Sequence, residues 1–224
     1  MDMNNLSQSA AGARQEEKAA ALQEAQGSKA GHSESLVLSV LLQLVRLVDV
    51  YCDTDPAWSL ELLQRAAPTV ERLDVLYPDE PHLRAVHAMP RLRRLLVMCN
   101  DDALQAAPPE LGALPPGHSG LRWLSVLCLP RATLQSLLQA HGGTLEELEL
   151  GVGAREERQW PWGCSDLHSL LAQCGLRALR RLVLRRLGRH RDTACGEQRA
   201  AVRAALPGVQ VLCDTCDRVL GEEP

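Results

Sequence analysis

One phrase recurs along this chain: an apolar residue, two spacers, an apolar residue, one spacer and a third apolar residue. A recurring unit constrains the fold more than any other sequence feature, because each unit can bury its apolar side only by stacking on its neighbours. The phrase occurs six times, and its last copy is the least regular. The copies span residues 70–75, 92–97, 121–126, 145–150, 179–184 and 209–214.

The spacing of the copies supports a single register. Their second apolar residues are Leu73, Leu95, Leu124, Leu148, Leu182 and Leu212, which lie 22, 29, 24, 34 and 30 residues apart. Leucine-rich units run about 20–29 residues, so most spacings fit and two carry insertions. The Pro- and Gly-rich stretch 106–120 explains the 29-residue spacing, and the stretch 151–163 explains most of the 34-residue one.

Helix signals alternate with the phrases. Asp55-Pro56 and Glu80-Pro81 each open a helix with proline in its first turn. Apolar residues at helical spacing also predict helices that end at Gly142, that start near Asp166, and that cover residues 197–206. The predicted fold class is therefore α/β. It is a leucine-rich repeat solenoid, a horseshoe arc with parallel inner strands and outer helices, over residues 55–224.

The N-terminal part lacks the phrase. Residues 1–34 are polar and predict a disordered or transiently helical tail. Ser33 or Ser35 can cap a helix from Leu36, so residues 35–54 predict a helical N-terminal cap over the first repeat. The alternative for this segment is the remnant of an adaptor-binding helical domain.

Composition favours an intracellular location. The first 35 residues show no signal peptide, and the apolar run 36–50 is too short and too charged to span a bilayer. Eight cysteines without a signal peptide indicate reduced thiols in a cytoplasmic or nuclear protein. The formal net charge of −4 provides no global attraction to nucleic acid.

The residues between the phrase's apolar positions are the predicted binding surface. Side chains alternate along a strand, so these residues face the inner, concave side of the arc. Trp and Arg are enriched in binding hot spots, which makes Trp123, flanked by Arg94 and Glu147, the best single candidate. The candidates are Arg72, Asp74, Tyr77, Arg94, Leu96, Met98, Trp123, Ser125, Glu147, Glu149, Arg181, Val183 and Arg185. The alternative is a half-buried tryptophan within an ordinary solvated surface.

Two stretches, residues 137–150 (LLQAHGGTLEELEL) and 86–95 (VHAMPRLRRL), resemble the repeats of F-box/leucine-rich repeat proteins. The resemblance covers about residues 55–215 and implies a substrate-recognition arm of a cullin-RING ubiquitin ligase. It also implies an adaptor contact through residues 36–60. No F-box is recognisable, because residues 36–50 do not match its compact helical segment with an opening Leu-Pro pair. A stand-alone scaffold or inhibitor is the alternative.

A basic stretch over residues 177–191 provides a second alternative, the binding of nucleic acid or an acidic partner. It has no interleaved aromatic residue for base stacking, and its arginines alternate with leucines as in a solvated strand. The glutamates of the preceding unit can pair with it. A solvated face is therefore favoured, and nucleic acid is an unlikely partner.

Cys213 and Cys216 form a two-spacer cysteine pair. Structural zinc requires four ligands, and the nearest further candidates are Cys195, His190 and Cys174. There is no second tight pair, so we predict a closing strand and terminal cap, with no metal and no cofactor.

Catalytic motifs are lacking. The sequence has no Gly-rich phosphate loop, no Gly-x-Ser-x-Gly elbow and no His-Glu-x-x-His. A triad can be assembled from residues far apart in a chain, so sequence alone leaves that arrangement open. The prediction is a protein-binding module that is not an enzyme.

Overall fold

The structure is a computed structural model that describes residues 46–99, 102–154, 159–187 and 190–219. All of these residues belong to one compact unit, Leu42–Pro224. The predicted tail, residues 1–34, and residues 35–45 of the predicted cap lie outside the described residues.

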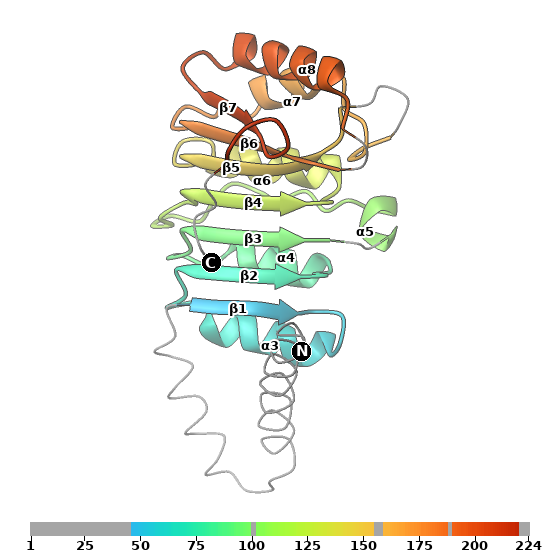
Figure 1. Cartoon of the computed structure of the whole chain (residues 1–224). Coiled ribbons are helices and arrows are strands. Elements are labelled where there is room, and N and C mark those ends of the chain that lie inside the picture. Colours follow the sequence, from blue (N-terminus) through green and yellow to red (C-terminus); the bar gives the residue numbers. More distant parts are fainter. Residues whose placement is uncertain (1–45, 100–101, 155–158, 188–189, 220–224) are drawn as a thin grey trace, which may run out of the picture. The chain divides into compact units, whose positions relative to one another are not determined.

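Seven parallel strands form one sheet, in which spatial order equals chain order (Figure 1). Each copy of the repeated phrase forms one strand, and one further strand precedes them. The strands are β1 (Arg46–Tyr51), β2 (Arg72–Leu76), β3 (Arg94–Met98), β4 (Trp123–Leu127), β5 (Glu147–Val152), β6 (Arg181–Arg186) and β7 (Gln210–Cys213). The α/β class and the parallel strands are confirmed.

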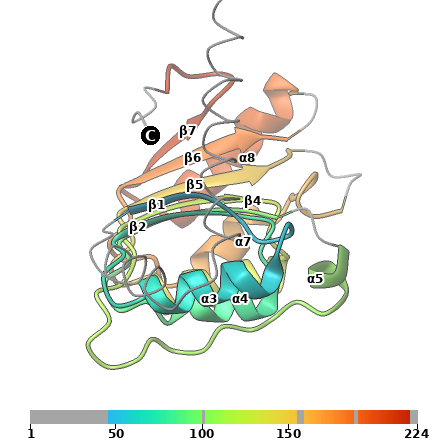
Figure 2. The ribbon, with the colours of Figure 1, turned by 90° about the horizontal axis from the view of Figure 1, so that it is seen from below.

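Helices connect successive strands and cover one face of the sheet. Figure 2 shows α3, α4 and α7 on the same side of the strands. The helices are α3 (Pro56–Ala66), α4 (Glu80–His87), α5 (Asp102–Ala106), α6 (Arg131–His141), α7 (Leu167–Ala172) and α8 (Asp192–Ala205). We call the opposite face, which carries no helix among the described residues, the open face. Within the described ranges, no helix is both long and apolar enough to cross a membrane.

The repeated apolar residues build the core because the strands align in register. Leu73, Leu95, Leu124, Leu148 and Leu182 lie side by side and are at most 2% exposed. Burying one such side chain stabilises the fold by about 1.5–3 kcal/mol. The core is thus a ladder of aliphatic layers under the helices.

The prediction of a helical cap over residues 35–54 is wrong for Arg46–Tyr51, which form strand β1. β1 pairs in parallel with β2, and its register shifts between Leu47 and Val50. Asp49 within this shift has a φ of 55°, the left-handed conformation typical of a bulge. The bulge inserts one residue between the two apolar positions, so the phrase loses its spacing and the segment reads as helical.

One helix start differs from its prediction, and one helix was not predicted. Helix α8 begins at Asp192 rather than Glu197, because Arg191 is extended and Asp192 supplies a favourable negative charge in the first turn. Helix α5 was not predicted, and within the Pro- and Gly-rich stretch 106–120 only its last residue, Ala106, is helical.

Candidate functional site

Three rows of side chains cross the open face, since alternate residues of each strand point away from the helices. The first row is Arg46, Arg72, Arg94, Trp123, Glu147, Arg181 and Gln210. The middle row is Asp74, Leu96, Ser125, Glu149, Val183 and Leu212. The third row starts with Tyr51, Leu76, Met98 and Leu127.

Arg94 and Trp123 stack on each other in the first row. The Arg94 guanidinium carbon lies 4.7 Å from the centre of the Trp123 ring, within the range of a cation–π interaction. Both side chains are half-buried. The stack places the tryptophan next to a line of arginines on the neighbouring strands.

That line consists of Arg46, Arg72 and Arg94, which occupy the same register position on three adjacent strands. Like charges placed directly opposite each other destabilise a sheet. Asp74 lies in the adjacent middle row. Burial raises the pKa of its carboxyl, against the opposing effects of Arg72, Arg46 and Arg94. One partly desolvated carboxylate therefore faces three arginines, and this end of the open face is basic.

At the β5–β6 end of the open face, arginines and glutamates form ion pairs. Arg181 Nη1 lies 3.2 Å from Glu147 Oε2, and Arg185 donates to Glu149 through Nε at 3.0 Å and Nη2 at 2.7 Å. The predicted pairing of the glutamate-rich phrase with the basic stretch is confirmed for these two arginines.

The predicted surface residues are not equally accessible. Asp74, Ser125, Glu149 and Val183 are 8%, 5%, 7% and 1% exposed. Strands lie about 4.8 Å apart, so larger neighbours screen the middle row. The expectation that these four side chains line an accessible surface is wrong. The other nine predicted surface residues are half-buried and therefore partly accessible. They are Arg72, Tyr77, Arg94, Leu96, Met98, Trp123, Glu147, Arg181 and Arg185.

The third row is apolar and partly exposed at its β1 end. Tyr51 is 51% exposed, and its ring centre lies 6.4 Å from that of Tyr77. Further along, a methyl group at Gly151 would lie 2.6 Å from Leu127 Cδ2, so the glycine leaves room for that leucine. At the β1 end of the open face, the arginines of the first row therefore run parallel to the apolar side chains of the third row. The two rows are four residues apart along β2, β3 and β4, or about 13 Å.

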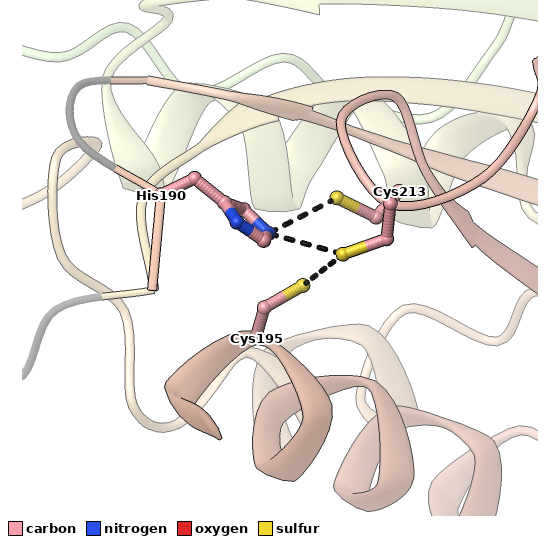
Figure 3. A group of neighbouring side chains, drawn as sticks. His190, Cys195 and Cys213 are labelled. Atoms are coloured by element: carbon pink, nitrogen blue, oxygen red, sulfur yellow. Dashed lines mark hydrogen bonds between the residues drawn. The ribbon is translucent and has the colours of Figure 1, made fainter. Parts of the chain in front are cut away.

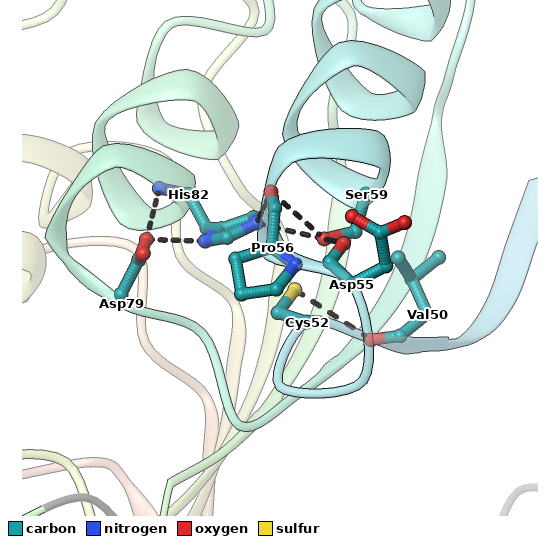
Figure 4. A network of polar contacts seen from close by, with 7 residues as sticks. All are labelled: Val50, Cys52, Asp55, Pro56, Ser59, Asp79 and His82. Atoms are coloured by element: carbon teal, nitrogen blue, oxygen red, sulfur yellow. Dashed lines mark hydrogen bonds and ion pairs between the residues drawn. The ribbon is translucent and has the colours of Figure 1, made fainter.

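Ser59, His82 and Asp79 form a network with the composition of a catalytic triad (Figure 4). Ser59 Oγ lies 2.9 Å from His82 Nε2, and His82 Nδ1 contacts Asp79 Oδ1. Sequence reasoning left such an arrangement open but did not identify these residues.

The network's polarity and burial oppose catalysis. Ser59 Oγ donates to the Asp55 carbonyl at 2.8 Å, and His82 Nε2 lies 3.1 Å from the Pro56 carbonyl oxygen. A catalytic histidine must accept the serine proton, whereas this Nε2 faces a carbonyl that only accepts. Ser59 and His82 are 0% and 1% exposed, which denies a substrate access. The network joins α3 to α4.

The cysteine pair of the C-terminus does not stand alone. His190 and Cys195 join Cys213 and Cys216, and the four candidate ligand atoms lie within 4.8 Å of one another. Cys174 is not part of this cluster, since its thiol donates to Leu170 O at 3.1 Å. The sequence already offered Cys195 and His190 as further ligands, but no metal was predicted because the chain has no second tight cysteine pair. His190 and Cys195 are separated by four residues, and this spacing was the further signal of a second ligand pair.

Comparisons with family models, with curated proteins and with solved structures find no significant match to this chain.

Proposed function

We propose that this chain is a protein-binding module of the leucine-rich repeat type, and that its partner binds the β1–β4 end of the open face. The observation that carries the proposal is the Arg94–Trp123 stack beside Arg72 and Arg46. Buried aromatic and arginine side chains dominate the binding energy of protein interfaces. A stack that is half-buried in the free protein is already ordered, so less side-chain entropy is lost on binding.

The chemistry of the surface indicates the partner's chemistry. Three in-register arginines favour a partner with acidic side chains, and the row of Tyr51, Met98 and Leu127 favours apolar ones. A segment that carries both, separated by about the length of a strand, would satisfy both rows.

A role as the recognition arm of a cullin-RING ligase is a narrower form of this proposal. Residues 46–51 form β1, residues 56–60 begin α3, and residues 52–55 connect these two elements. A helical adaptor-docking segment would have to lie before residue 46. A stand-alone scaffold or inhibitor needs no such segment. Deletion of the residues before β1 should therefore abolish adaptor binding in a ligase arm and change nothing in a stand-alone binder.

Nucleic-acid binding through residues 177–191 has less support. Arg181 and Arg185 are engaged by glutamates, and Arg186 is engaged by Gln198 and by two cysteine sulfurs. Arginines already paired within the protein release fewer counterions from a phosphate backbone.

The test is affinity capture with quantitative mass spectrometry on the full chain and on Trp123→Ala/Arg94→Glu. The matched control is Arg93→Glu, which makes the same charge change on an exposed side chain outside the strand. We expect the double variant to lose its main partner at least tenfold, since hot-spot truncations remove about 2 kcal/mol or more each. The control should retain that partner.

Equal recovery of all partners by the double variant and the full chain would rule out the open face as the binding surface. A chain that lacks residues 1–41 distinguishes the two forms, because it keeps every described element. Loss of cullin and adaptor with this chain alone would establish a ligase arm. Recovery of the partner by both chains, with cullin and adaptor absent from both, would establish a stand-alone binder.

A further inference from the structure

We propose that His190, Cys195, Cys213 and Cys216 bind a structural zinc ion that closes the C-terminal end of the repeat stack. Figure 3 shows His190, in the loop before α8, and Cys195, in the first turns of α8, converging on Cys213 at the end of β7. Zinc sites that serve structure have four protein ligands, and three cysteines with one histidine are a common set. Such a closed set leaves no position for a substrate.

Three of the distances between the ligand atoms are close to those of a zinc tetrahedron, and all four atoms lie within 4.8 Å of one another. With Zn–S near 2.3 Å and Zn–N near 2.0 Å, tetrahedral geometry places two sulfurs about 3.8 Å apart, and a sulfur and the nitrogen about 3.5 Å apart. The Cys195 and Cys216 sulfurs are 3.9 Å apart. His190 Nε2 lies 3.6 Å from the Cys213 sulfur and 3.2 Å from that of Cys216. A disulfide would hold its sulfurs at about 2.05 Å, and all of these cysteines are free.

Surrounding groups hold the histidine as zinc ligands are usually held. His190 presents Nε2 to the sulfurs, and its Nδ1 lies 3.1 Å from Asp192 Oδ1. A histidine that binds zinc almost always donates its other ring N–H to a carboxylate, a carbonyl or water. That donation fixes the tautomer that leaves Nε2 free to bind the metal.

A positive charge faces the sulfurs. Arg186 Nη2 donates to the Cys195 sulfur at 2.9 Å, and its Nε donates to the Cys213 sulfur at 3.4 Å. Three thiolates and one Zn²⁺ carry a net charge of about −1, so one guanidinium balances the centre. The three thiol protons leave to solvent when the metal binds.

The turn that carries the cysteine pair is also held in place. Asp217 Oδ2 accepts from the Cys213 N–H at 2.8 Å, and Arg199 of α8 pairs with Asp217 at 2.8 Å. The ligands thus tie the residues after β7 to α8 and to the loop before it. A repeat stack must close its last layer, and zinc would do so here with few apolar residues.

The experiment measures metal content and coordination in the full chain, purified under reducing conditions without chelator. We expect about one zinc per chain, and an X-ray absorption spectrum with three sulfurs near 2.3 Å and one nitrogen near 2.0 Å. A chain that contains no zinc and takes up neither Zn²⁺ nor Co²⁺ on titration would overturn the proposal. Bound zinc with only oxygen and nitrogen ligands would overturn it as well.

Variants test the individual ligands. Cys195→Ser should lose the zinc, whereas Cys128→Ser, the same change outside the cluster, should keep it. Asp192 is 96% exposed at its side chain, so Asp192→Asn should fold normally. Loss of its carboxylate should weaken zinc affinity about 10–100-fold. Full zinc content and unchanged affinity in Cys195→Ser would overturn the assignment of that ligand.

Discussion

His141 is the last residue of α6 and is only 2% exposed. Its ring centre lies 5.5 Å from that of His87 and 5.6 Å from that of His118. Its Nδ1 accepts a hydrogen bond from the Leu121 N–H at 3.1 Å, which requires the neutral ring. Burial, with His87 and His118 nearby, lowers the pKa of His141 to about 3.

We therefore expect the fold to lose stability as the pH falls from about 6.5 towards 3. The pKa of His141 in the folded state lies below its ordinary value of 6.5. The stability that the neutral ring gives to the fold is therefore fully present above pH 6.5, and it is lost as the pH falls towards the folded-state pKa. The contribution is of the order of a few kcal/mol. Urea unfolding of the full chain at pH 7 and pH 5 measures it.

His141→Gln should flatten this pH dependence, because the amide oxygen can accept the Leu121 N–H and does not titrate. His168→Gln, a change in α7 outside the histidine cluster, is the matched control and should keep the wild-type slope. An unchanged slope in His141→Gln would show that His141 does not drive the acid sensitivity.

The sequence predicted some residue placements well and others not at all. The proximity of Arg94 and Trp123 followed from aligning two phrases, since register fixes which side chains are neighbours. The contact of His118 with His141 could not be predicted, because His118 lies in the aperiodic stretch 106–120. Tertiary stacking alone brings these rings together.

Among the elements, α3 and α4 begin in closely similar ways. Asp55 accepts from the Trp58 N–H at 3.0 Å, and Asp79 accepts from the His82 N–H at 3.1 Å. Each helix also has a proline in its first turn. The two caps differ because Asp79 additionally contacts the buried ring of His82.

Because the two caps differ, replacing each aspartate with alanine should lower the free energy of unfolding by different amounts. Asp55→Ala removes a cap alone and should lower the free energy of unfolding by about 1 kcal/mol. Asp79→Ala also leaves a buried ring nitrogen unsatisfied, so a further loss of about 1–3 kcal/mol is expected. Chemical denaturation of the two variants at one pH measures both. Equal losses would show that the Asp79–His82 contact contributes nothing to stability.

At the level of elements, the sequence predicted the strands with regular spacing and missed the irregular one. β2 to β7 follow the repeated phrase, whereas the bulge at Asp49 hid β1 within an apparently helical pattern. Local spacing reports a strand only when the strand pairs without insertions. The sequence offered all four residues of the metal-ligand cluster as candidates but did not predict a site, because they come from a loop, a helix, the end of β7 and a turn that only the fold assembles.

In the described part of the chain, the strands form a stack in which each strand pairs only with its neighbours in sequence order. The stability of such a stack is approximately a sum of unit and nearest-neighbour contributions, so its ends are the weakest points. Among the described residues, β7 pairs with one strand only, β6. β7 is also short, with four residues. The proposed zinc site lies at this end, where an additional link has the greatest local effect.

Removal of zinc should therefore loosen one end of the molecule and leave the middle unchanged. With a chelator present, we expect faster amide hydrogen exchange in α8 and β7, and unchanged exchange in β2, β3 and β4. Hydrogen-exchange mass spectrometry of the full chain, with and without chelator, measures this pattern. In Cys195→Ser, α8 and β7 should already exchange fast, and the chelator should have no effect. A uniform increase along the whole sheet would contradict nearest-neighbour behaviour, because it would mean that the C-terminal link stabilises the stack as a single cooperative unit.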